Sequence, residues 1–195
     1  RFLAETPSGS ESQATAQALA GWGERLAGRP DEAIERMRRA SEIDKEVPYG
    51  ALLQAMLLFA EYVDEQPLPG VTTGGDKGLA FEGLPPETGQ MKQRREAMVR
   101  LLPQAKGAAI WGRQESDAYA AALAGMRAVQ AGDYVEAEGA LTRAIDGAAL
   151  RWMRTSLDLA RGKARYLRMD FEGAERDVEE VSRIRAGQAS VRYVL

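Results

Sequence analysis

The chain has neither cysteine nor histidine among its 195 residues. Without cysteine it can form no disulfide and offers no thiolate to zinc or to a nucleophilic mechanism. Without histidine it lacks the commonest metal ligand and the usual general base near neutral pH. Carboxylate and Ser–Lys chemistry remain open, but no motif in the sequence names a reaction. We therefore expect a protein that is not an enzyme and that uses no cofactor or metal.

Long apolar stretches and a strong excess of one charge are also missing. The longest apolar stretch, Ala51 to Ala60, is interrupted by Gln54 and falls short of the ~20 residues that a membrane-spanning helix needs. The formal net charge of -3 is too small to indicate a nucleic-acid footprint or a surface for acidic lipids. We expect neither membrane insertion nor nucleic acid as a partner.

The sequence does not decide the cellular compartment of the protein. The chain begins at Arg1 and not at a methionine, which suggests a processed form or a piece of a longer protein. No signal peptide is visible, and a chain without cysteine suits a reducing or an oxidising compartment. We favour the cytoplasm, with export after removal of a signal segment as the alternative.

Three segments share one skeleton, at 18–40, 122–144 and 159–181. Each has a glycine twelve residues before an alanine, and apolar residues follow that alanine at the spacing of one helix face. Glycine inside a helix costs about 1 kcal/mol relative to alanine, so we expect each glycine to permit the close approach of a second helix at the alanine. The pairs are Gly21 with Ala33, Gly125 with Ala137, and Gly162 with Ala174.

A turn separates the two halves of each segment. Gly28 and Gly132 suit the left-handed residue that ends a helix. Asp31, Asp133 and Asp170 can cap the start of the following helix or stabilise it by charge. Each segment therefore predicts a pair of helices joined by a tight turn.

The stretches GRPDEAIERMRRA and AGDYVEAEGALTRAI resemble the turn and second helix of tetratricopeptide repeats, whose units are antiparallel helix pairs of 34 residues. The resemblance covers about half of the chain and is of the bacterial type. The third copy departs from it, with Met169 in place of glycine and Val181 in place of alanine. The family implies an all-α fold, a right-handed superhelix of antiparallel helix hairpins. We expect about four hairpins in one domain, 1–195, with repeats near 12–46, 49–106, 115–148 and 152–187.

The second repeat is degenerate. Apolar spacing predicts helices at 49–64 and 90–106, and Pro103 predicts a kink or break in the latter. Between them, the insertion 65–89 is rich in glycine and proline and has no helical period. We interpret it as a variable surface loop. The alternative is a lid laid across a groove and anchored by Leu79, Phe81 and Leu84.

In a stack of helical hairpins, the first helix of each pair lines the concave wall. On that face the chain places a mixture of aromatic, methionine and polar side chains, which is typical of protein-binding grooves. The alternative is that several of them pack between neighbouring repeats. The predicted groove residues are Trp22, Arg25, Tyr119, Met126, Gln130, Lys163 and Tyr166. The carboxylate clamp of one subclass of the family is missing, because Ala122 and Met126 stand where its amide side chains belong.

Basic residues gather at Lys92, Arg94, Arg95, Arg100 and Lys106. We interpret them as a solvated helix face with ion-pair partners at helical spacing, and a patch that attracts an acidic partner is the alternative.

These features lead to three hypotheses about function. The first is a protein–protein interaction module, a scaffold or adaptor that holds a protein or peptide partner in its concave groove. The second is a regulatory or ligand-sensing helical-repeat domain excised from a larger enzyme or transcription regulator. The third is a homo-oligomeric subunit that assembles through Val178, Val181 and Ile184 of its last helix.

Overall fold

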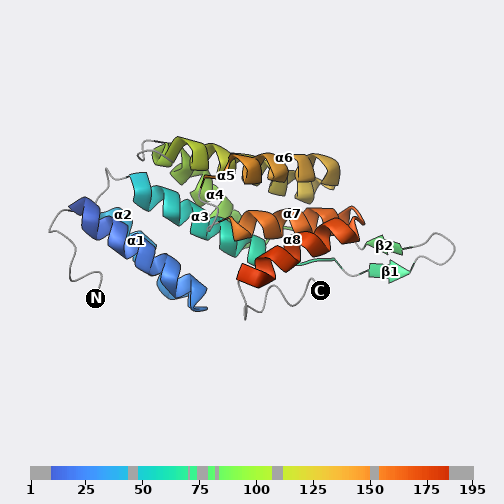
Figure 1. The fold of residues 1–195 in the computed structure, drawn as a ribbon, viewed down its shortest axis with the longest axis horizontal. Coiled ribbons are helices and arrows are strands. Elements are labelled where there is room, and N and C mark those ends of the chain that lie inside the picture. The colour runs from blue at the N-terminus through green and yellow to red at the C-terminus, as the bar shows by residue number, and fades with distance from the viewer. Residues whose placement is uncertain are drawn as a thin grey trace.

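A computed structural model describes residues 10–43, 48–69, 71–73, 79–81, 84–106, 112–149 and 154–184. These residues form eight helices and one pair of short strands (Figure 1). The helices are α1 (Ser10–Leu26), α2 (Pro30–Ile43), α3 (Pro48–Glu65), α4 (Gly89–Ala105), α5 (Gly112–Ala131), α6 (Tyr134–Gly147), α7 (Thr155–Leu167) and α8 (Phe171–Ile184). The predicted all-α class is confirmed.

Successive helices pack in pairs: α1 on α2, α3 on α4, α5 on α6, and α7 on α8. Three of the four pairs are joined by the same turn, in which one residue has a positive φ. Gly28 has φ 77°, Gly132 φ 78° and Met169 φ 65°. After each, a backbone N–H donates to a carbonyl five residues earlier, as in Asp133 to Ala128 at 2.9 Å. This bond satisfies a carbonyl at the helix end that has no partner within the helix.

The predicted close approach of glycine to alanine is confirmed in all three of these pairs. A Cβ on Gly21 would lie 3.0 Å from the Ala33 carbonyl oxygen. At Gly125, a Cβ would lie 3.1 Å from the Ala137 carbonyl oxygen and 2.8 Å from Leu141 Cγ. At Gly162 the corresponding contact with the Ala174 carbonyl oxygen is 3.5 Å. Glycine thus brings the two helix backbones close enough to touch.

Two of the predicted aspartate caps are also confirmed. The Asp133 carboxylate accepts the Glu136 backbone N–H at 3.1 Å, and the Asp170 carboxylate accepts that of Gly173 at 3.0 Å. The side chain of Asp31 lies outside the described residues.

Helix α3 forms the centre of the molecule and contacts α1, α2, α4, α5 and α7 (Figure 1). Nearly every residue from Ala51 to Val63 is buried, so this helix is apolar around most of its circumference. Phe59 has no exposed surface and meets the Tyr119 ring of α5 edge-on, with centroids 5.4 Å apart. The helices predicted at 49–64 and 90–106 are thus observed within one residue as α3 and α4, and α4 continues past Pro103 to Ala105.

The insertion between α3 and α4 differs from the structureless loop that its composition predicts. Strands β1 (Val71–Thr73) and β2 (Leu79–Phe81) pair antiparallel, with Thr72 opposite Ala80. In Figure 1 this hairpin projects beyond the helices. Of the predicted anchors, Leu84 is half-buried against the core, and the side chains of Leu79 and Phe81 lie outside the described residues.

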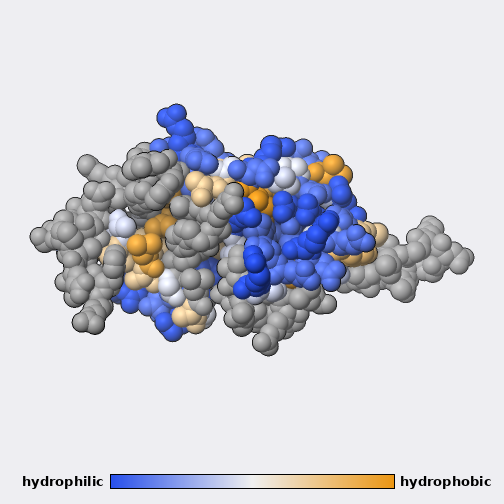
Figure 2. Space-filling model, in the orientation of Figure 1, coloured by the Kyte–Doolittle hydropathy of each residue, from blue (hydrophilic) through white to orange (hydrophobic). Residues whose placement is uncertain are grey.

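Figure 2 shows hydrophilic side chains covering the α7 and α8 face. Over the residues that the structure describes, no helix combines the length and the apolar character needed to cross a membrane.

Candidate functional site

Four of the seven residues that the sequence predicts to line a concave groove are buried. The side chains of Arg25, Tyr119, Met126 and Lys163 are between 1% and 5% exposed, which places them in the interior. This position differs from the prediction and matches the alternative, in which these residues pack between hairpins. The physical reason is that α7 closes against α3, so the space between them contains side chains and no open groove.

A cluster of charges at the end of α3 holds this closure, and we call it the α3 end cluster. Glu61, Asp64 and Glu65 stand in the last turns of α3, where the helix dipole is already negative. Cations from three other helices compensate them. Arg25 of α1 contacts Glu61 at 3.2 Å and Asp64 at 2.5 Å, and Arg94 of α4 pairs with Glu65.

Lys163 of α7 completes the α3 end cluster without a carboxylate partner of its own. Its Nζ donates to the carbonyl oxygens of Val63 and Gln66 at 2.5 and 2.7 Å. These carbonyls lie at the C-terminal end of α3, where carbonyls lack intrahelical donors. Burial lowers the pKa of Lys163 to about 8, which the nearby Asp64 charge partly opposes. The lysine therefore serves as a buried cap on another helix.

The other predicted site residues lie in three different settings. Tyr166 is half-buried and packs edge-on against Phe171, with ring centroids 5.7 Å apart. Gln130 is half-buried and lines a surface cavity described below. The side chain of Trp22 lies outside the described residues. The structure therefore does not bring the predicted groove residues together on one open surface.

The proposed self-assembly face is also occupied within the chain. Val178 and Val181 have no exposed surface, and Val178 lies against Gly162 of α7. The side chain of Ile184 lies outside the described residues.

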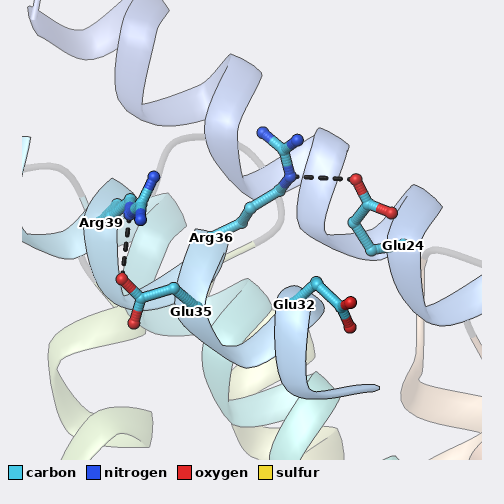
Figure 3. Close-up of a pocket in the computed structure, with 5 residues that line it drawn as sticks. All are labelled: Glu24, Glu32, Glu35, Arg36 and Arg39. Carbon is cyan, nitrogen blue, oxygen red and sulfur yellow. Dashed lines mark hydrogen bonds and ion pairs between the residues drawn. The ribbon is translucent and has the colours of Figure 1, made fainter. Parts of the chain in front are cut away.

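A cavity of about 420 Å³ lies on the surface between α1 and α2 (Figure 3). Its charged lining residues largely pair with one another. Arg36 Nε is 3.1 Å from Glu24, and Arg39 Nε is 3.0 Å from Glu35. Because these carboxylates and guanidinium groups already satisfy each other, this cavity offers a ligand little charge that is not already neutralised.

The gap between α4 and α5 is a better candidate. It holds a cavity of about 300 Å³ whose floor is apolar, formed by the buried side chains of Leu102 and Leu123. Val99 also lines it and is 46% exposed. Ser116 ties the two helices together beneath the cavity, because its hydroxyl donates to the Leu102 carbonyl at 2.6 Å.

Arg127 also lines a second cavity, of about 310 Å³. Its other lining residues are polar: Tyr62, Glu87, Arg95 and Gln130. We call the two together the α4–α5 groove, with an apolar part at Val99, Leu102 and Leu123 and a polar part at Glu87, Arg95 and Gln130. Lys106 stands at the far end of the apolar part.

In the polar part, Glu87 is already engaged. Arg95 donates to both of its oxygens at 3.0 Å, and the Tyr62 hydroxyl donates to it at 2.9 Å. The Arg95 guanidinium holds the pKa of Glu87 below its usual range, so this carboxylate is ionised. Burial and the Glu87 charge raise the pKa of Tyr62, so its hydroxyl stays protonated as a donor.

Arg127 differs from these residues because it is exposed and forms no hydrogen bond or ion pair with any residue that the structure describes. No described residue therefore occupies its guanidinium donors, and it lines both parts of the groove.

Sequence reasoning names the α4 residues of this groove only as a basic cluster. Arg94, Arg95 and Lys106 do form ion pairs, but with Glu65, Glu87 and Asp117, which lie outside α4 and not at helical spacing. Arg94 is also buried, so the predicted solvated helix face is wrong at that residue. The signal that could have located the groove is the stripe Arg95, Val99, Lys106 on one face of the predicted helix. That signal says nothing of α5, which supplies the opposite wall.

Searches for relatives return no match to any family model, curated protein or solved structure. Within the described ranges, no three carboxylates converge in a way that could hold a metal ion.

Proposed function

We propose that the chain is a tetratricopeptide-like right-handed superhelix that serves as a scaffold or adaptor and binds another protein through a peptide segment. The repeated hairpin geometry supports the family. Gly21, Gly125 and Gly162 each approach the second helix of their pair, and the three turns end in the same positive-φ conformation. Stacked helical hairpins of this kind offer extended surfaces for partners.

The observation that carries the proposal is the α4–α5 groove. An exposed valine beside a buried leucine floor leaves apolar surface in contact with water, which a partner side chain would cover favourably. The volume of about 300 Å³ in the apolar part suits one or two side chains of a segment, and is too small for a folded domain. We therefore assign the partner to this groove and not to the filled concave wall.

The test is a selection of random dodecapeptides, displayed on phage, against the immobilised chain. Enriched peptides are then synthesised with a fluorophore, and their binding is measured by fluorescence anisotropy. We expect saturable binding with a Kd of roughly 1–100 μM, as for small interfaces. Val99→Asp should weaken it about tenfold or more, because the substitution places a charge beside the apolar floor.

The matched control is Val135→Asp on α6, which makes the same change at a valine that is 66% exposed and lines neither part of the groove. It should leave binding unchanged. Absence of any enriched peptide, or equal loss of binding in both variants, would count against a peptide-binding function at this groove.

A further inference from the structure

We propose that the α4–α5 groove recognises an acidic peptide segment, in which a carboxylate reaches Arg127 and an adjacent aliphatic side chain enters the apolar part. This inference rests on the proposed function, because it names the class of segment that the groove takes. Three observations support it: the positive charge of the groove, the absence of an ion-pair partner for Arg127 among the described residues, and the backbone of α4 at Pro103.

The charge of the groove is opposite to that of the molecule. The chain has a formal net charge of -3. The groove, however, is lined by the cations Arg95, Lys106 and Arg127 and by a single carboxylate, that of Glu87. Lys92, one turn before Arg95 on the same face of α4, is exposed and adds to the positive side. An acidic segment is therefore attracted to this place.

The three cations are engaged to different degrees. Arg95 makes a bidentate contact with Glu87, which fixes its orientation. Lys106 pairs with Asp117 at 2.8 Å, but both side chains are more than half exposed, so water weakens that pair. Arg127 has no competing carboxylate among the described residues. A carboxylate of a bound peptide can therefore pair with Arg127 without breaking a described ion pair. The planar guanidinium suits bidentate contact with that carboxylate.

The backbone of α4 favours a peptide over a simple anion. Pro103 stands inside α4 and has no N–H, so the Val99 carbonyl lacks the donor of a regular helical bond. Both residues line the apolar part of the groove, at its edge. A backbone N–H of a bound segment can donate to this carbonyl while the side chain beside it fills the space above Leu102 and Leu123. A free carboxylate or phosphate ion has neither group to offer.

A basic segment would meet the charge of Arg127, which no described carboxylate pairs with, so the same arrangement disfavours it. The groove therefore discriminates by charge in addition to shape, which is the combination by which interfaces reject wrong partners.

The experiment uses the dodecapeptides that the phage selection against the whole chain enriches. Their amino-acid composition is determined first. We expect enrichment of aspartate and glutamate next to leucine, isoleucine or valine. For the best peptide, Arg127→Glu should weaken binding by about tenfold or more, and a peptide with lysine in place of its acidic residues should regain binding to that variant. Raising NaCl from about 50 to 300 mM should weaken the wild-type complex.

The matched control is Arg176→Glu, which reverses an exposed arginine on α8 and should change the Kd less than about twofold. Circular dichroism confirms that both variants keep their helices. Enriched peptides that are neutral or basic, or acidic peptides indifferent to Arg127→Glu, would overturn this inference and leave the proposed function standing. Failure to enrich any peptide would instead contradict the proposed function.

Discussion

The α5–α6 and α3–α4 hairpins solve the same packing problem by different means. In α5–α6, Gly125 lets the two backbones touch and Gly132 joins the helices by a turn with a positive φ. In α3–α4, the connection is long and contains a strand pair, and the first helix is almost wholly buried among five others. The regular hairpin, α5–α6, depends on the backbone geometry of a few glycine positions. The irregular hairpin, α3–α4, depends on the extensive burial of apolar side chains.

The difference also separates structural from candidate binding features. The regular hairpins satisfy their own helix ends with left-handed turns and aspartate caps. The end of α3 is satisfied from outside, by Arg25 and Lys163 of distant helices. Helix α4 does not follow the repeat pattern, and it contains Pro103 and cations of the α4–α5 groove. Departure from the repeat thus coincides with the features that we assign to function.

The largest effect should come from the core of the irregular hairpin. Phe59→Ala removes a ring with no exposed surface and should lower the free energy of unfolding by about 4 kcal/mol. Phe171→Ala is the matched change in the edge-on aromatic pair of α7 and α8, where the ring is 43% exposed, and should lower it by about 1 kcal/mol. Urea titration of both variants measures the contrast, and similar losses would show that α3–α4 does not depend on the complete burial of this ring.

The regular hairpin should be most sensitive at its glycine. Gly125→Val forces side-chain carbons against Leu141 and the Ala137 carbonyl, and we expect a loss of about 3 kcal/mol. Gly139→Ala, within α6, meets only the end of Arg143 at 3.5 Å and should instead raise stability by about 1 kcal/mol through helix propensity. Thermal unfolding compares them, and a tolerated valine at position 125 would show that backbone contact is not required.

Lys163→Met tests the external capping of α3. The variant leaves the Val63 and Gln66 carbonyls without their donor and should lose about 2 kcal/mol near pH 7. The lysine pKa of about 8 in the folded chain lies below the value of about 10.4 expected when unfolded, so the unfolded state binds more protons between them. The wild type should therefore gain stability relative to the variant as pH rises from about 8 to 10, by at most about 1.4 kcal/mol per unit.

Comparing the two chains at each pH cancels titrations that they share, including that of Tyr62. A stability difference that stays flat across this range would show that Lys163 is not held in a buried, charge-disfavouring site. Lys92→Met, which removes an exposed lysine of α4, is the matched control for the loss of a lysine charge.

The smallest effect concerns the one regular turn that lacks glycine. Met169 adopts φ 65°, a conformation that strains any residue with a Cβ. Met169→Gly should raise the free energy of unfolding by about 1 kcal/mol. The reciprocal change, Gly132→Met, should lower it by a similar amount at φ 78°. Equal stability of the wild type and both variants would show that a Cβ carries no cost at the positive φ of these turns.

Much of the fold is predictable because its signals are local. The spacing of Gly125 to Ala137 and the turn glycine Gly132 lie within a few turns of one another, so a single pattern predicts both helices and their contact. The apolar run of α3 likewise predicts a buried helix. The strand pair at Val71–Thr73 and Leu79–Phe81 was not predicted, because three-residue strands leave too short a pattern to separate from a loop.

The site was less predictable because its geometry is long-range. Lys163 was assigned to an open wall on the basis of its position in α7 alone, and its two acceptors lie about a hundred residues earlier. The groove needs Val99 of α4 beside Leu123 of α5, and no spacing within either helix reveals how the two are rotated. Positions on one helix face are readable from sequence, whereas the neighbour that covers the face is not.

The bond from Lys163 to the end of α3 also bears on how the chain folds. In an array whose units touch only their neighbours, the last unit can fray while the rest stays intact. Here the fourth hairpin holds the second across a separation of 100 positions, so its detachment exposes a buried helix end and unpaired carbonyls. Local opening at α7 is then coupled to loosening of α3, which favours one cooperative transition over stepwise melting. Such distant contacts also have to form late, which makes folding slower than in an open array of the same length.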